Sequence, residues 1–228
     1  MKNKPSIAAV EPERQHTIIL WDPLVEAAAP AFRLAGIMIM ASMIIPVGLE
    51  AFTDRAWVAG LVLVGVAVVV AALGLLELYP WVNDTAPVLA KTGALFSVIG
   101  GTAALTLLAG VAVVLVADVA VGPNLRLLKG AFMTLVLLMA GGYSLGFLSF
   151  GIGSLRTEVP SRTVGRLLVV GGVVLLVPVV GQLLRLGFGI GPPPWVAFLM
   201  LGLSAVITLS VGYSLDSEKN PFEAPQEQ

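Results

Sequence analysis

Apolar residues form long uninterrupted stretches in this chain, and charged residues fall almost entirely between them. A transmembrane helix needs about 20 consecutive, mainly apolar residues. Six stretches approach or exceed this length, and we predict one membrane-spanning helix in each. Their approximate boundaries are 32–52, 56–77, 92–117, 130–155, 167–185 and 195–215.

The clearest stretch runs from Ala56 to Leu76, carries no charge and is rich in Val and Ala. The β-branched valines would weaken a helix in water. Inside lipid, a helix is the conformation in which one segment satisfies its own backbone hydrogen bonds, so the helix is favoured. A membrane β-barrel would instead alternate polar and apolar residues over segments of about 10 residues. The predicted fold class is therefore all-α, a polytopic transmembrane helical bundle.

The regions outside the spans are short and polar. Residues 1–30 form an N-terminal tail, in which Asp22 and Pro23 suit the cap and the first position of a helix. Two interpretations remain open for this tail: a short interfacial helix ending near Ala29, or a loosely ordered cytosolic segment. No apolar stretch directly follows the early lysines, so a cleaved signal peptide is not expected. Residues 216–228 are acidic and are predicted to be disordered.

Six spans place both termini on one side of the membrane, and the basic residues are divided unequally between the two sides. Because basic loops tend to stay in the cytoplasm, both termini are predicted to be cytoplasmic, in a cell membrane. The nine basic residues on the side of the termini are Lys2, Lys4, Arg14, Arg33, Lys91, Arg156, Arg162, Arg166 and Lys219. The four on the other side are Arg55, Arg126, Lys129 and Arg185.

Composition narrows the chemistry of the chain. It is 57% hydrophobic and 12% charged, whereas soluble domains are about 45–50% apolar and about 25% charged. The net charge of −1 and the scattered basic residues argue against nucleic acid as a partner. The chain has no cysteine, and its single histidine, His16, precedes the first span. We therefore predict no catalytic residues, no metal site, no cofactor and no enzymatic activity.

Ionisable residues near membrane depth are candidates for function, and here all of them lie near span ends. Glu77 and Lys91 share the predicted cytoplasmic side. One hypothesis is a gate or an ion-binding carboxylate, for which Glu77 and Asp118 are favoured. The alternative is that these side chains reach the headgroups or form local ion pairs. The opposite side of the membrane holds Glu50, Asp118, Lys129 and Arg185.

Uncharged polar residues lie deeper in the spans. Thr102 and Thr106 share a face of the third span, Tyr143 lies in the fourth, and Ser204 and Thr208 share a face of the sixth. Together they would line a polar path. The alternative is that the hydroxyl groups bond back to their own helices or bridge neighbouring ones.

Small residues at steps of four predict close helix contacts, because lipid supplies no hydrophobic drive for helices to associate. Gly93, Ser97 and Gly101 lie on one face of the third span, and Gly142 and Gly146 on one face of the fourth. These faces fit contacts within the bundle, and they also fit contacts between copies of the chain.

Two Pro-Trp-Val triplets, at 80–82 and 194–196, follow the second and fifth spans. Three spans followed by three inverted spans is an arrangement found in transporters. A true repeat and a chance match between low-complexity segments both remain open.

The stretch from Phe150 to Arg166, Phe-Gly-Ile-Gly-Ser-Leu-Arg-Thr-Glu-Val-Pro-Ser-Arg-Thr-Val-Gly-Arg, resembles loops of uncharacterised small multi-pass membrane proteins from haloarchaea. The Val- and Ala-rich spans, the absence of cysteine and the acidic tail are similar to those proteins too. The resemblance implies a cell-membrane protein and assigns no site residues.

Two functional hypotheses follow. The first is a structural, accessory or regulatory membrane component, whose partners are the lipid bilayer and either other membrane subunits or further copies of itself. The second is a small transporter or channel with a polar path along the third, fourth and sixth spans.

Overall fold

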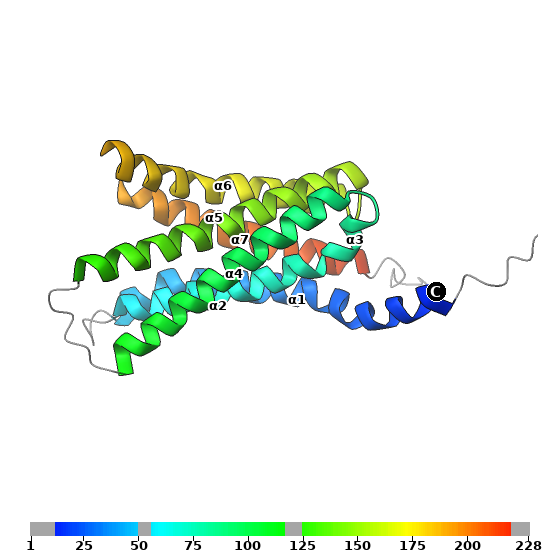
Figure 1. The fold of residues 1–228 in the computed structure, drawn as a ribbon, viewed down its shortest axis with the longest axis horizontal. Coiled ribbons are helices and arrows are strands. Elements are labelled where there is room, and N and C mark those ends of the chain that lie inside the picture. Colours follow the sequence, from blue (N-terminus) through cyan, green and yellow to red (C-terminus); the bar gives the residue numbers. More distant parts are fainter. Residues whose placement is uncertain (1–11, 50–55, 117–124, 220–228) are drawn as a thin grey trace, which may run out of the picture.

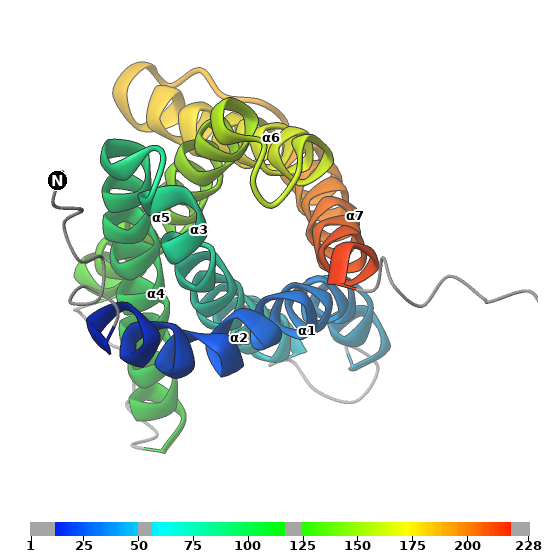
Figure 2. The ribbon, with the colours of Figure 1, turned by 90° about the vertical axis from the view of Figure 1, so that its right-hand side faces the viewer.

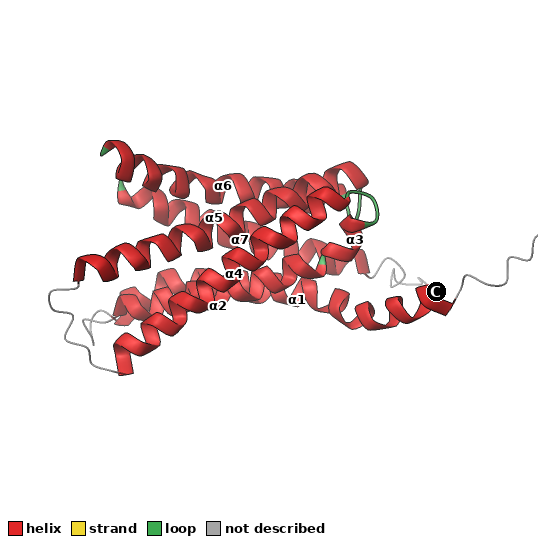
Figure 3. Cartoon of the chain, viewed as in Figure 1, coloured by secondary structure: helices red, strands yellow, loops and turns green. Residues whose placement is uncertain are grey.

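Helices occupy nearly all of the chain that the structure describes (Figures 1 and 3). The computed structural model describes residues 12–49, 56–116 and 125–219. Within these ranges the chain forms helices and short connections, and no strand. The helices are α1 (Pro12–Leu49), α2 (Ala56–Glu77), α3 (Tyr79–Asn83), α4 (Pro87–Val116), α5 (Leu125–Thr157), α6 (Arg162–Phe188) and α7 (Pro194–Lys219).

Six of these helices contain apolar stretches long enough to cross a bilayer, which confirms the predicted fold class. Every helix except α3 contains one such stretch, and each stretch overlaps a predicted span. The stretches are Ala27–Pro46, Val58–Glu77, Pro87–Val113, Gly130–Thr157, Arg162–Phe188 and Trp195–Ser217.

Some helices begin earlier than the predicted spans, where their first turns are polar. α6 begins at Arg162 instead of near residue 167, because the Ser161 hydroxyl accepts a hydrogen bond from the Val164 backbone N–H at 3.2 Å and caps the helix. α4 begins at Pro87, a residue type that suits the first position of a helix because its missing N–H would have no partner there. Lys91 therefore lies within α4 and not in the connection before it.

α1 is one continuous helix of 38 residues. It begins at Pro12, so the helix does not start at Asp22 as predicted, and no separate short helix ends near Ala29. Proline inside a helix removes a hydrogen bond and favours a kink, but it does not have to end the helix. The part of α1 before the span extends beyond the ends of the other helices (Figure 1).

The sequence did not predict α3, a five-residue helix between α2 and α4. Its Val82 is fully buried and packs so closely on α5 that a Cβ on Gly153 would lie 2.5 Å from Val82 Cγ1. Pro80 and Trp81 belong to α3, whereas Trp195 lies in the first turn of α7. The two Pro-Trp-Val triplets therefore occupy elements of different kinds.

The six long helices form a closed ring. Each contacts the next in the order α1, α2, α4, α5, α6, α7, and α7 returns to α1 (Figure 2). Glycines allow close approach where the ring closes: a Cβ on Gly36 of α1 would lie 2.5 Å from Leu209 Cγ of α7, and one on Gly212 would lie 2.7 Å from Arg33 Cγ. The first and last spans are thus packed directly against each other.

Aromatic side chains fill part of the interior of this ring. Phe32 of α1, Tyr143 and Phe147 of α5 are all buried, and the Phe147 ring meets both of the others edge-on. The outer faces are also apolar: Ile44 of α1 is 71% exposed and Val170 of α6 is 50% exposed. Lipid solvates such faces, whereas water would oppose their exposure.

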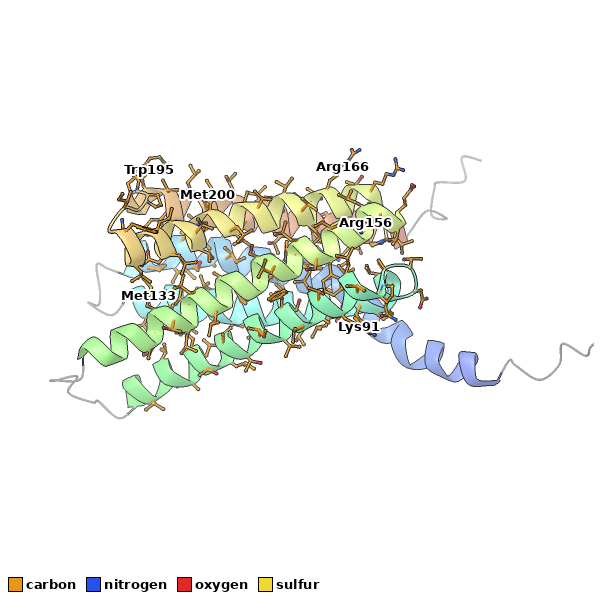
Figure 4. All side chains as sticks on the ribbon, turned by 45° about the horizontal axis from the view of Figure 1, so that its top comes forward. Lys91, Met133, Arg156, Arg166, Trp195 and Met200 are labelled. Atoms are coloured by element: carbon orange, nitrogen blue, oxygen red, sulfur yellow. The ribbon has the colours of Figure 1, made fainter. Side chains whose placement is uncertain are left out.

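The bundle has two ends that differ in composition. The first, which we call the α3 end, contains α3, the connection 158–161 and the last turn of α7. The second, the α6–α7 end, contains the connection 189–193. Figure 4 places Lys91, Arg156 and Arg166 toward the first end and Trp195 toward the second. The span of α1 starts and that of α7 stops at the α3 end, as an even number of spans requires.

Candidate functional site

Of the charged residues predicted near membrane depth, those that the structure describes lie at two different ends of the bundle. Glu77 is the last residue of α2 and is half-buried at the α3 end. Lys91 is exposed in α4. Glu50 and Asp118 lie outside the described residues, and the side chain of Lys129 does too.

Arg185 has a local partner at the α6–α7 end. Its Nη2 donates a hydrogen bond to the Pro192 carbonyl oxygen at 2.9 Å. The same turn follows the end of α6, where Gly189 adopts a left-handed φ of 69° and its N–H donates to the Arg185 carbonyl. A glycine is needed here because other residues rarely adopt that conformation. Arg185 thus stabilises the turn between α6 and α7.

Thr102 and Thr106 point away from the ring. Both are exposed, and the Thr106 hydroxyl donates to the Thr102 carbonyl oxygen at 2.9 Å. The spacing of four predicted a shared face, and the structure places that face toward lipid. Neither residue meets the buried Tyr143, so the three do not line one path.

Tyr143 crosses the interior of the ring. It belongs to α5, is 2% exposed, and its ring lies 4.5 Å from that of Phe147. Its hydroxyl lies near the Thr208 hydroxyl of α7, although α5 and α7 are not neighbours in the ring. The two hydroxyls do not form a hydrogen bond of acceptable geometry, and Thr208 donates its own proton to the Ser204 carbonyl at 2.7 Å. Within the described residues the Tyr143 hydroxyl has no hydrogen-bond partner.

Several other buried hydroxyls of the ring donate to backbone carbonyls, whereas that of Ser154 in α5 has no partner among the described residues. Ser97 donates to Gly93 within α4 at 2.8 Å, and Ser204 donates to Leu201 within α7 at 2.7 Å. Ser144 is different because its acceptor belongs to another helix: it donates to the Gly172 carbonyl of α6 at 2.7 Å. This hydrogen bond ties α5 to α6, and its acceptor could not be predicted from the sequence.

The small residues of the fourth and fifth helices meet along one seam. A Cβ on Gly142 of α5 would lie 2.7 Å from the Gly100 backbone nitrogen of α4, and one on Gly146 would lie 2.8 Å from Ser97 Oγ. Gly93 packs on the Phe150 ring in the same seam.

Gly101 departs from the predicted seam and packs on Ala72 of α2 instead, at 3.4 Å. With 3.6 residues per turn, the position seven residues after Gly93 lies closer to its face than the position eight residues after it. Gly100 therefore takes the place at the contact that the steps of four assigned to Gly101.

An ion pair that the sequence did not predict joins the first and last spans. Arg33 Nη1 lies 3.1 Å from Asp216 Oδ2, and the Arg33 guanidinium lies 5.6 Å from the centre of the Tyr213 ring. These residues are about 180 positions apart, so only the closed ring brings them together. At the same end Arg162 pairs with Glu158 across the connection before α6.

The described residues offer little chemistry beyond these contacts. No three His, Cys, Asp or Glu side chains among them lie close enough to share a metal ion. Comparisons with models of known protein families, with curated proteins and with solved structures find no match to this chain. The interior around Tyr143 is thus the candidate site that the geometry supports best.

Proposed function

We propose that the chain is a non-catalytic structural or accessory component of the cell membrane, with both termini in the cytoplasm. The observation that carries this proposal is the closed ring, whose interior is occupied by Phe32, Tyr143 and Phe147. A conduit needs polar groups that face one another along a path. Here Thr102 and Thr106 face lipid instead.

The use of the buried hydroxyls also supports a packing role. Ser97, Ser144 and Thr208 each donate their proton to a backbone carbonyl at 2.7–2.8 Å. Their donors are therefore not available to a substrate or a permeating molecule. A bundle that uses its polar groups in this way stabilises its own fold. The surfaces that remain for contact with other molecules are the lipid-facing sides and the two ends of the bundle.

The distribution of basic residues supports the orientation. The α3 end carries Arg33, Lys91, Arg156, Arg162 and Arg166 among the described residues. Over the whole sequence the division between the two sides is nine to four. Basic residues near span ends favour the cytoplasmic side, which supports a cytoplasmic α3 end.

A small transporter or channel is the second candidate, and the Tyr143 hydroxyl favours it. This donor is buried near the Thr208 hydroxyl of α7 and has no hydrogen-bond partner among the described residues. A small permeating molecule that accepts a hydrogen bond would satisfy it. This candidate requires the aromatic side chains of the interior to move aside.

Flux into proteoliposomes separates the two candidates. We expect purified protein to give no ion flux and no small-solute permeability above protein-free liposomes, and Tyr143→Phe and Thr208→Val to change nothing. Thr106→Val, which alters a lipid-facing residue of similar size, is the matched control. Flux that depends on Tyr143 and Thr208 but not on Thr106 would establish the conduit and overturn the packing role.

Removal of the chain from its native cell tests the accessory role itself. We expect at least one membrane complex to change its abundance or its migration on native gels, and reintroduction of the chain to restore it. If every membrane complex is unchanged in the deletion strain, the accessory role is wrong.

A further inference from the structure

The seam between α5 and α6 carries two arginines at the α3 end. Arg156 and Arg166 are both exposed. Within the described part of the chain, neither guanidinium forms an ion pair or a side-chain hydrogen bond. The neighbouring Arg162 differs because it pairs with Glu158. Two unpaired positive charges thus remain on this side of the bundle.

The packing of the two helices fixes the level of these arginines. A Cβ on Gly165 of α6 would lie 2.9 Å from the Leu155 backbone nitrogen of α5, so these two residues face each other across the seam. Arg156 and Arg166 each follow one of them directly in the sequence. Because the two helices are antiparallel and rise 1.5 Å per residue, the arginines lie within about 3 Å of one level along the bundle.

The helix geometry also fixes their side. In two antiparallel helices, the residues that follow the contacting positions turn toward the same side of the pair, because each helix advances by about 100° per residue. Burial agrees with this assignment. The residues before the contacts, Ser154 and Val164, are fully buried, whereas Arg156 and Arg166 are exposed. Both arginines therefore face the lipid side of the seam.

Apolar side chains continue the same surface toward the middle of the membrane. Ile152, one turn before Arg156, is 37% exposed, and Val170, one turn after Arg166, is 50% exposed. Val173 follows on the same face of α6 and is 51% exposed. Along this seam the surface thus changes from two guanidinium groups to a row of aliphatic side chains. The guanidinium groups match the negative headgroup of a phospholipid, and the aliphatic side chains match its acyl chain.

The depth of the arginines fits a headgroup. The α6 stretch has 27 residues, which corresponds to about 40 Å at 1.5 Å per residue. The hydrocarbon core is about 30 Å thick and the headgroup layers add about 10–15 Å in total. The first turns of α6 therefore lie among the headgroups, where phosphate groups are at hand and guanidinium forms paired hydrogen bonds with them.

We propose that Arg156 and Arg166 form a binding site for the phosphate of an anionic phospholipid, whose acyl chain lies along Ile152, Val170 and Val173. The α6 N-terminus is nearby, and its positive dipole end adds to the attraction. The site belongs to the leaflet at the α3 end. It goes beyond the structural role proposed above and does not depend on it.

Native mass spectrometry of the full-length protein in detergent tests the site. The probes are a phosphatidylglycerol and a phosphatidylcholine with identical acyl chains. We expect the wild type to retain phosphatidylglycerol at least about 10-fold more strongly than phosphatidylcholine, since the first is anionic and the second carries no net charge. The double variant Arg156→Gln/Arg166→Gln should lose this preference.

The control variant Lys91→Gln/Arg162→Gln removes the same number of charges from the same end, and we expect it to keep the preference within about twofold. The variant Arg156→Lys/Arg166→Lys should keep part of it, because Lys retains the charge but not the paired hydrogen bonds. Equal loss in both glutamine variants would mean that only total charge matters and would overturn the site. Retained preference in Arg156→Gln/Arg166→Gln would overturn it too, and so would displacement of the lipid by inorganic phosphate at millimolar concentration.

Discussion

Buried hydroxyl groups in this bundle differ in where they donate their protons. Those of Ser97, Ser144 and Thr208 donate to carbonyl oxygens, which offsets the cost of removing them from water. The hydroxyl of Tyr143 lies at the far end of a rigid ring that points into the bundle, away from the carbonyls of its own helix. It has no partner among the described residues. The stability of the fold therefore does not come from this group, although the Tyr143 ring fills the interior.

We expect Tyr143→Phe to leave the free energy of unfolding unchanged or to raise it by about 1 kcal/mol, since it removes an unsatisfied polar group. Tyr143→Ala should lower it by about 3–5 kcal/mol because it leaves a cavity. Equilibrium unfolding in mixed micelles, followed by circular dichroism, measures both changes. A loss of more than about 1 kcal/mol in Tyr143→Phe would show that the hydroxyl has a partner, such as a bound water.

Individual polar residues were the part of the site that the sequence predicted least well. Helical spacing correctly groups Thr102 with Thr106 on one face, but it does not indicate whether that face meets lipid or the interior. An apolar span has no solvent-facing polar side to orient it, so amphipathic patterns carry no information here. Tyr143 was a candidate because of its depth, and its contact with α7 follows from the ring alone.

Among the helices, α4 and α5 approach each other closely through small residues. Gly100 and Gly142 meet backbone to backbone, so neither position has room for a side chain. Lipid gives no hydrophobic advantage to this contact, and its stability comes from van der Waals packing over the close approach. Any added atom must push the two helices apart.

Gly142→Ala should therefore lower the free energy of unfolding by about 1–3 kcal/mol, the usual range for overpacking. Gly130→Ala is the matched control. It lies in the same helix, and an added Cβ there meets no atom within 4 Å. We expect the control to be as stable as the wild type or slightly more so, because Ala is the better helix former. Equal effects of the two changes in the same unfolding assay would contradict the proposed contact.

The sequence predicted all six spans because their length and polarity are set by the bilayer. It predicted the ends of the helices less accurately, since polar first turns are not distinguished from loops by hydropathy. The cap at Ser161 and the start of α4 at Pro87 are local signals that capping rules can detect. α3 is too short to have a periodic pattern, and its position depends on Val82 packing against Gly153 of α5.

At the scale of the whole molecule, the ring closes where α7 meets α1. Arg33 links the two helices through Asp216 and the Tyr213 ring, and all three residues lie at the α3 end. The ion pair is partly exposed, so water and salt weaken it. The close packing at Gly36 and Gly212 contributes to the same contact.

Arg33→Gln and Asp216→Asn should each lower the free energy of unfolding by about 0.5–1 kcal/mol at low salt. The double variant should lose less than the sum, because both single changes remove the same interaction. Glu158→Gln, which breaks the local pair between the connection 158–161 and Arg162 of α6, is the control and should have a smaller effect. Strict additivity of Arg33→Gln and Asp216→Asn would mean that the two side chains do not interact in the membrane.

The account depends most on six membrane crossings with the α3 end in the cytoplasm. Because the chain has no cysteine, a single introduced cysteine can report on each end. Thr85 is exposed in the connection before α4 and reports on the α3 end. Gly187, where an added Cβ meets no atom within 4 Å, reports on the α6–α7 end. In intact cells a maleimide that does not cross membranes should label Gly187→Cys, and it should label Thr85→Cys only after the cells are broken. Labelling of both in intact cells would contradict the crossing of the membrane between them, and labelling of Thr85→Cys alone would contradict the orientation.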